Sequence, residues 1–177
     1  MNPNPRESLW ITTIILCLRI ILKLKNGKGD LEYFQLPNGG QKRFYSDLMS
    51  HVKIDPQKRF ALHEIYRSFV EWLGEDIVPT FSEFVEMHSK CNTNMHGILI
   101  YSEECVHYGN ALYLGASAID HSCQPNSLWI NDGKELVLRT ISDVADFSDL
   151  RVPYIDTMTL CSVTLQRKIE LFEVKFS

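Results

Sequence analysis

Two reactive side chains lie close together in the segment Asp120-His121-Ser122-Cys123-Gln124-Pro125-Asn126. A histidine and a cysteine form a nucleophilic pair when the imidazole takes the proton of the thiol. His121 and Cys123 are only two residues apart, a spacing at which they do not readily face each other, and no nearby pattern indicates an oxyanion hole. The alternative is a buried turn, because Pro125 and Asn126 are typical turn residues. Taken alone, the segment leaves both interpretations open.

The segments around this motif follow in a specific order. Residues 112–119 lead into it, an Asp132-Gly133 turn separates two apolar runs, and Leu150-Arg151-Val152-Pro153-Tyr154-Ile155-Asp156 comes next. This order resembles the SET domain of lysine methyltransferases, specifically its SET-and-MYND (SMYD) branch, in which NHSCxPN is followed by a hairpin and a strand ending in xxYxD. Cys91-Asn92 resembles the CN pair of that branch, and the helices before it resemble the insert after the MYND zinc finger. The resemblance covers most of residues 6–172.

The resemblance implies an α+β fold in which a helical insert region precedes the short-stranded C-terminal part of a SET domain. SET enzymes thread the tyrosine segment past the NHSC segment in a knot-like active centre, which forms a pocket for S-adenosylmethionine and a channel for the target lysine. The implied function is a protein-lysine N-methyltransferase acting on a histone or non-histone protein. By the same resemblance Tyr154 is the catalytic residue, and Asn92, Asp120 and His121 bind the cofactor. Without the motif, Tyr154 is equally compatible with a core tyrosine at a strand end.

The residue types suit methyl transfer. The reaction displaces a methyl group in line from a sulfonium to a neutral amine, and lysine, with a pKa of about 10.4, must first lose its proton. An apolar channel favours the neutral amine, and alignment of donor and acceptor supplies much of the rate. A tyrosine hydroxyl ringed by carbonyls orients the amine and stabilises the cationic methyl group without a covalent bond.

The chain departs from the family pattern in several places. Position 120 is Asp, whereas the family has Asn. The aspartate carboxylate keeps an acceptor for the cofactor's ammonium group, but it lacks the two N–H donors of the asparagine amide and adds a negative charge. The early Gly-x-Gly strand is missing, since Gly27-Lys28-Gly29 follows the first predicted helix and indicates a helix end. Cys123 matches a zinc-ligand position of the family, but the MYND and post-SET cysteines are missing. We therefore expect Cys123 to be a free, buried thiol, with no zinc site in this chain.

These departures leave two functions open. One is an S-adenosylmethionine-dependent methyltransferase. The other is a non-catalytic SET-like module that binds a protein partner, because the chain resembles a family member trimmed at both ends. Missing first strands would also leave sheet edges unpaired.

The elements that position these residues divide the chain into a leader (residues 1–5), a helical region (6–90) and a C-terminal SET region (91–177). Turn signals predict a loop at Leu36–Gly40. Apolar spacing and a capping box at Thr80 predict five helices, at about Arg6–Lys25, Gln41–Ser50, Asp55–Leu73, Thr80–Lys90 and Ser162–Phe172. Short strands are predicted at residues 97–101, 104–108, 128–130, 136–138 and 150–154. The Asp-Gly turn gives the strongest hairpin signal.

Apolar periodicity defines the faces that two of these helices are expected to bury. The face of the first helix consists of Ile11, Ile14, Ile15, Leu18, Ile21 and Leu22. The face of the Asp55–Leu73 helix consists of Phe60, Ile65, Phe69 and Trp72. The apolar run from Trp10 to Leu24 also permits a membrane anchor. Arg19 interrupts this run, which is shorter than the roughly 20 residues needed to span a bilayer. We therefore expect a buried amphipathic helix and no membrane association.

The composition is that of an ordinary globular domain. Of the 177 residues, 45% are hydrophobic and 23% are charged, and a net charge of -4 gives no strong attraction to nucleic acid or to an anionic membrane. The five cysteines are odd in number and lack CxxC spacing, which argues against a disulfide framework and indicates reduced thiols. We therefore expect a cytoplasmic or nuclear protein that binds a protein substrate and no nucleic acid.

Overall fold

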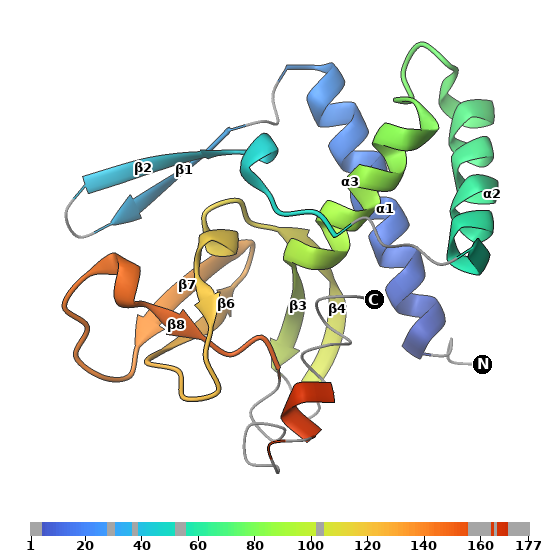
Figure 1. Cartoon of the computed structure of the whole chain (residues 1–177). Coiled ribbons are helices and arrows are strands. Elements are labelled where there is room, and N and C mark those ends of the chain that lie inside the picture. Colours follow the sequence, from blue (N-terminus) through green and yellow to red (C-terminus); the bar gives the residue numbers. More distant parts are fainter. Residues whose placement is uncertain are drawn as a thin grey trace.

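Helices gather on one side of the molecule and small sheets on the other in the computed structural model (Figure 1). The structure describes residues 5–27, 31–36, 39–51, 56–101, 105–155, 164 and 166–169. The strands of these ranges form four two-stranded sheets. The mixture of helices and small sheets confirms the predicted α+β class.

Helix α1 (Pro5–Lys25) confirms the first predicted helix, and its buried face agrees with the predicted one only in part. Ile21 is buried as predicted, and Ile14 and Leu18 pack against the core. Two residues expected on the buried face, Ile11 and Ile15, are 54% and 50% exposed. The buried side chains of the helix are those of Thr13, Leu16, Cys17, Ile20 and Ile21. A face that includes a threonine and a cysteine gives a weaker apolar signal than an aliphatic one, which explains why the predicted face is shifted from the observed one.

Helix α1 lies against α3 (Phe81–Asn94) and β4 (Cys105–Leu112). The Asn110 amide of β4 donates a hydrogen bond to the Thr12 hydroxyl at 2.9 Å, so the strand offers a polar partner to this helix. None of the helices in the described ranges combines the length and hydropathy that a membrane-spanning segment requires.

A β-hairpin replaces the loop and the helix that the sequence predicted between Leu36 and Ser50. β1 (Leu31–Leu36) and β2 (Gly39–Phe44) pair antiparallel along their whole length, and a short 3-10 helix (Tyr45–Asp47) follows. Cross-strand pairing with β1 satisfies the backbone groups of Gly39–Phe44, which a helix beginning at Gln41 would require within its own segment. The predicted helix at Gln41–Ser50 is therefore wrong.

The local signals at the ends of the next two helices are confirmed. α2 (Pro56–Leu73) ends at Gly74, which has φ = 87°, a left-handed conformation that favours glycine. The Thr80 hydroxyl and the Glu83 carboxylate form the predicted capping box at the start of α3. α3 then continues past the predicted end at Lys90 to Asn94.

The core of the helical region is built on aromatic and aliphatic side chains of α2 and α3. Leu62, Phe69 and Phe84 are each 1% exposed. Phe60 and Trp72 were expected on the buried face of α2, but they are 69% and 73% exposed. The prediction of this face is therefore correct at Phe69 and wrong at its two ends.

Two antiparallel hairpins confirm four of the predicted strands. β3 (Met95–Tyr101) pairs with β4, and β6 (Ser127–Asp132) pairs with β7 (Glu135–Thr140). Gly133 adopts φ = 57° in the turn between β6 and β7, which is the conformation that the Asp-Gly signal predicts.

The fifth predicted strand is short and has an unexpected partner. β5 (Asp120–His121) pairs in parallel with β8 (Arg151–Val152). The predicted helix at Ser162–Phe172 lies largely outside the described residues, of which residues 164 and 166–169 are helical. Most of the predicted leader also lies outside them.

Candidate active site

The segments that carry the predicted site residues meet where β5 and β8 lie side by side. Asp120 is paired with Arg151, and His121 with Val152. The Ser122 amide donates a hydrogen bond to the Val152 carbonyl at 3.0 Å. The motif and the segment before Tyr154 are therefore in direct backbone contact.

Asn126, the last residue of the motif, joins three segments of the chain. Its side-chain amide nitrogen donates to the Asp149 carbonyl at 2.8 Å, and its side-chain oxygen accepts from the Arg151 amide at 2.8 Å. Its backbone carbonyl accepts from the Ile141 amide, also at 2.8 Å. These hydrogen bonds are long-range contacts rather than the local turn expected of Asn126, and they fix the approach of the segment that leads to Tyr154.

Both the backbone and the side chain of Tyr154 are bound to the motif region. The Tyr154 amide donates to Nδ1 of His121 at 3.0 Å, and the Tyr154 hydroxyl donates to the Ile119 carbonyl at 2.7 Å. Burial raises the pKa of Tyr154, the Asp120 carboxylate acts in the same direction, and the positive charge of Arg43 opposes them. The hydroxyl is therefore neutral at physiological pH.

His121 and Cys123 face each other, contrary to the expectation from their spacing. Nε2 of His121 lies 3.1 Å from the Cys123 sulfur. A backbone amide only donates, so Nδ1 of His121 accepts from Tyr154 and carries no proton, and the proton of the neutral ring is on Nε2. A base that activates a thiol needs an unprotonated nitrogen facing the sulfur. The contact therefore argues against a cysteine nucleophile, and it holds the imidazole beside Tyr154.

Cys123 is a free thiol, and it is partly exposed rather than buried as expected. Within the described ranges, no three side chains of His, Cys, Asp or Glu come together as a potential metal site. Structural zinc requires four ligands. A thiol beside a single imidazole does not meet this requirement.

Arg43 of β2 was not selected from the sequence, yet its charge acts on Tyr154. Nε of Arg43 is buried without a hydrogen-bond partner, and Nη2 donates to the Asp47 carbonyl at 3.4 Å. Asp120 is exposed, and neither it nor Arg43 belongs to an ion pair among the described residues.

Asn92, the remaining predicted site residue, lies in the last turn of α3. Its side-chain amide nitrogen donates to Nδ1 of His88, one helical turn earlier, at 3.4 Å. In the described part of the chain, no hydrogen bond joins Asn92 to the other predicted site residues. The structure thus brings Asp120, His121 and Tyr154 together, and it holds Asn92 through its own helix.

His88 is expected to make the stability of the protein depend on pH. Burial lowers the pKa of His88 from 6.5 to about 4, with a smaller contribution from the charge of Lys58. Between these two values only the unfolded chain binds the proton, so the free energy of unfolding falls as the pH falls, by about 1.4 kcal/mol per pH unit. Urea denaturation at pH 7 and pH 5 should show a loss of about 2 kcal/mol from this residue.

The control is His88→Gln, which removes the titrating ring. This variant is expected to lose about 2 kcal/mol less than the unmodified protein between pH 7 and pH 5. Identical pH dependence in the two proteins would show that His88 is not buried in its neutral form.

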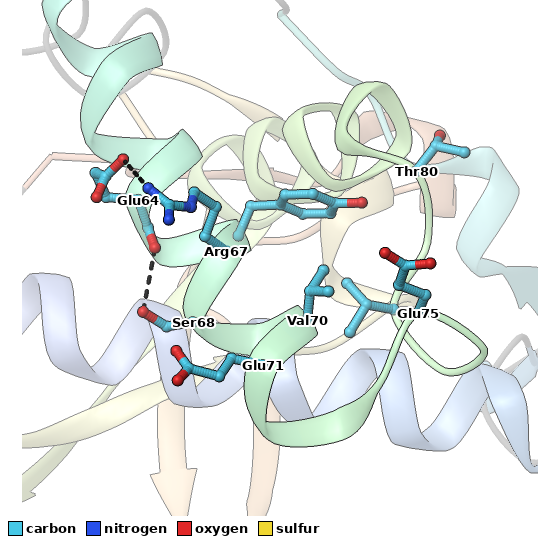
Figure 2. A pocket seen from close by; sticks show the side chains of 9 residues that line it. Glu64, Arg67, Ser68, Val70, Glu71, Glu75 and Thr80 are labelled. Atoms are coloured by element: carbon cyan, nitrogen blue, oxygen red, sulfur yellow. Dashed lines mark hydrogen bonds and ion pairs between the residues drawn. The ribbon is translucent and has the colours of Figure 1, made fainter.

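Figure 2 shows a groove beside α2. Its volume is about 790 Å³, and its walls carry the carboxylates of Glu64, Glu71 and Glu75 and the guanidinium of Arg67. Arg67 and the Glu64 carboxylate are 3.5 Å apart. None of the predicted site residues lines this groove, so it is separate from the candidate active site.

The chain is similar to one class of known proteins, the SMYD lysine methyltransferases. It is 26% identical over 149 residues to human histone-lysine N-methyltransferase SMYD3, an alignment that covers 79% of this chain and 32% of that protein. It is 27% identical over 165 residues to mouse N-lysine methyltransferase SMYD2, with coverages of 89% and 34%. It is also 27% identical over 168 residues to histone-lysine N-methyltransferase ASHR1 of Arabidopsis thaliana, with coverages of 95% and 34%.

No protein-family model matches the chain. The chain spans about a third of the length of the curated relatives it matches. Because the alignments cover most of this chain, they support the SMYD-like relationship that the sequence motif predicts.

Proposed function

We propose that this chain forms part of a SET-type protein-lysine N-methyltransferase of the SMYD branch that uses S-adenosylmethionine. The observation that carries the proposal is the attachment of Tyr154 to the motif region by two hydrogen bonds, from its amide to His121 and from its hydroxyl to the Ile119 carbonyl. The parallel pairing of β5 with β8 is compatible with the knot-like centre that we propose for this site. The similarity to SMYD lysine methyltransferases supports the same function independently.

The residues around Tyr154 fit such a cofactor in their chemistry. S-adenosylmethionine supplies, when bound, a methyl group on a positively charged sulfur. We assign the exposed Asp120 carboxylate to the cofactor's ammonium group, because it belongs to no ion pair among the described residues. We assign the His121 backbone to the adenine and the Asn92 amide to other polar atoms of the cofactor.

Tyr154 is assigned to the reacting amine. Its hydroxyl proton is engaged by the Ile119 carbonyl, so the lone pairs of the oxygen remain as acceptors. An acceptor at this position orients the lysine nitrogen and stabilises the positive charge of the methyl group. Because the pKa of Tyr154 is raised, the hydroxyl does not act as the base that deprotonates lysine. An apolar channel instead favours the neutral amine.

The proposed substrate is a protein with an accessible lysine, either a histone or a non-histone protein. Two of the relatives above are named as histone-lysine N-methyltransferases and one as an N-lysine methyltransferase. The net charge of -4 gives no reason to expect direct binding of nucleic acid. We place the activity in the cytoplasm or the nucleus.

Binding of S-adenosylmethionine is expected to stabilise the folded protein. At 100 times its Kd the cofactor adds about 2.7 kcal/mol to the free energy of unfolding, which raises the Tm by roughly 5–10 °C for a chain of this size. Thermal unfolding with increasing cofactor measures the effect. Adenosine is the control, since it shares the nucleoside but lacks the sulfonium and the amino-acid group.

A flat response at millimolar S-adenosylmethionine would contradict cofactor binding. That outcome would favour the second function considered above, a non-catalytic SET-like module that binds a protein partner.

A further inference from the structure

Helix α1 leaves an aliphatic stripe uncovered. Ile11, Ile15 and Leu22 are 54%, 50% and 39% exposed, and their spacing places them on one face of the helix. Arg19 follows Ile15 by one helical turn and Lys23 follows Arg19 by one more, so two exposed cations border the stripe. We call these five residues the cationic face of α1. Contiguous apolar surface that stays exposed marks an interaction site.

Helix α2 exposes aromatic side chains together with the opposite charge. Phe60 and Trp72 are 69% and 73% exposed. The groove of about 790 Å³ beside this helix carries the carboxylates of Glu64, Glu71 and Glu75 (Figure 2). We call these five residues the acidic face of α2. An exposed tryptophan beside a groove is the kind of residue that dominates binding energy when a partner buries it.

The two faces do not neutralise each other within one molecule. Neither Arg19 nor Lys23 forms an ion pair in the described ranges, and the same holds for Glu71 and Glu75. Each face therefore keeps charges that are free to pair with another molecule.

A second α1 is a poor partner for the cationic face. Pairing α1 with α1 would bring Arg19 and Lys23 of both copies into one contact, where like charges repel. The suitable partner is both apolar and acidic. The segment from Glu64 to Asp76 meets the second requirement with four acidic residues and one basic residue, and the exposed aromatic rings of α2 meet the first.

We infer that the cationic face of α1 docks on the acidic face of α2 in a second copy of this chain. The apolar side chains supply the buried area, and the opposite charges set the register and suppress other pairings. The contact either occurs twice in a closed two-fold dimer or continues head to tail from molecule to molecule. None of the predicted site residues belongs to either face, so the inference is independent of the proposed function.

Sedimentation equilibrium of the full chain measures this association. The weight-average mass is expected to rise with protein concentration and to fall with added salt, which screens exposed charges. Arg19→Glu and Glu71→Arg each place like charges opposite one another and should weaken the association at least about tenfold. Arg139→Glu is the matched control, a charge reversal at an exposed residue of β7 on the sheet side of the molecule (Figure 1). It should leave the association within about twofold.

An equimolar mixture of the two weakened variants gives the sharpest result. The intact cationic face of the Glu71→Arg protein meets the intact acidic face of the Arg19→Glu protein, so association should return to within about threefold of the unmodified level. The fluorescence emission of Trp72 should shift to shorter wavelengths as its ring becomes buried. Circular dichroism of each variant checks that it is folded.

Several outcomes would overturn the inference. One is a monomeric unmodified protein at concentrations up to about 1 mM, and another is a mixture whose two variants stay apart. Loss of association in Arg19→Glu but not in Glu71→Arg would mean that α1 docks on itself. Co-sedimentation with phosphatidylserine–phosphatidylcholine vesicles that is lost in Arg19→Glu and kept in Glu71→Arg would assign the cationic face to a lipid surface instead.

Discussion

Replacement of Phe84 by alanine is expected to destabilise the protein by about 3–5 kcal/mol. Phe84 is 1% exposed and packs edge-to-face against Phe69, with ring centroids 5.6 Å apart and an interplanar angle of 79°. The centroid of the Tyr66 ring lies 5.7 Å from that of Phe84. Alanine removes these contacts and leaves a cavity between α2 and α3 that close-packed neighbours cannot fill. Urea denaturation followed by circular dichroism measures the loss.

The matched control is Phe60→Ala, the same chemical change in a side chain that is 69% exposed. It is expected to change the free energy of unfolding by less than about 1 kcal/mol. If Phe84→Ala does not fold, Phe84→Leu keeps most of the buried volume and should still be less stable than Phe60→Ala. Equal losses at Phe84 and Phe60 would contradict the core described above and would favour the face predicted from periodicity.

The contrast between Phe60 and Phe69, both predicted on the buried face of α2, shows where periodicity fails to predict burial. The helix ends at Gly74 and Thr80 were predicted correctly. A left-handed glycine and a capping box depend only on residues a few positions apart in the sequence. The buried face of a helix is decided by its neighbours. α1 buries Thr13 and Cys17 and exposes Ile11 because α3 and β4, which it meets only after folding, determine its contacts.

The β1–β2 hairpin was missed for a related reason. Its residues include Gln41, Lys42 and Arg43, which are acceptable in a helix, and only cross-strand pairing with β1 makes the strand favourable. The error also placed Arg43 in a helix, whereas it lies in β2, from which its charge acts on Tyr154.

At the site, the sequence motif selected segments that the fold brings together, but it did not predict how their side chains are arranged. Residues 120–123 and Tyr154 were selected from the motif, and β5 and β8 bring these two segments together. The motif gave no means of predicting that His121 faces Cys123. That contact depends on the imidazole being held by the Tyr154 amide, which comes from a segment distant in the chain.

The largest effect on function is expected from Tyr154→Phe. Loss of the hydroxyl removes the acceptor that we assign to the lysine nitrogen and the methyl group, so the rate of methyl transfer should fall by about 100-fold to 1,000-fold. The Kd for S-adenosylmethionine should stay within about twofold, because the assigned cofactor contacts lie on other residues. Transfer of labelled methyl groups from S-adenosylmethionine to a pool of lysine-containing peptides measures the rate, and calorimetry measures the Kd.

Tyr113→Phe is the matched control for this experiment. The Tyr113 hydroxyl donates to the Lys134 carbonyl at 3.0 Å, as the Tyr154 hydroxyl donates to the Ile119 carbonyl at 2.7 Å. Each substitution therefore removes one hydroxyl-to-carbonyl hydrogen bond and should cost about 1 kcal/mol of stability. Because both variants lose the same kind of hydrogen bond, a loss of methyl transfer confined to Tyr154→Phe, in protein that remains folded, reports a role of that hydroxyl in the reaction. If both variants lose activity equally, or if Tyr154→Phe also loses cofactor binding, the Tyr154 hydroxyl supports the fold rather than the chemistry.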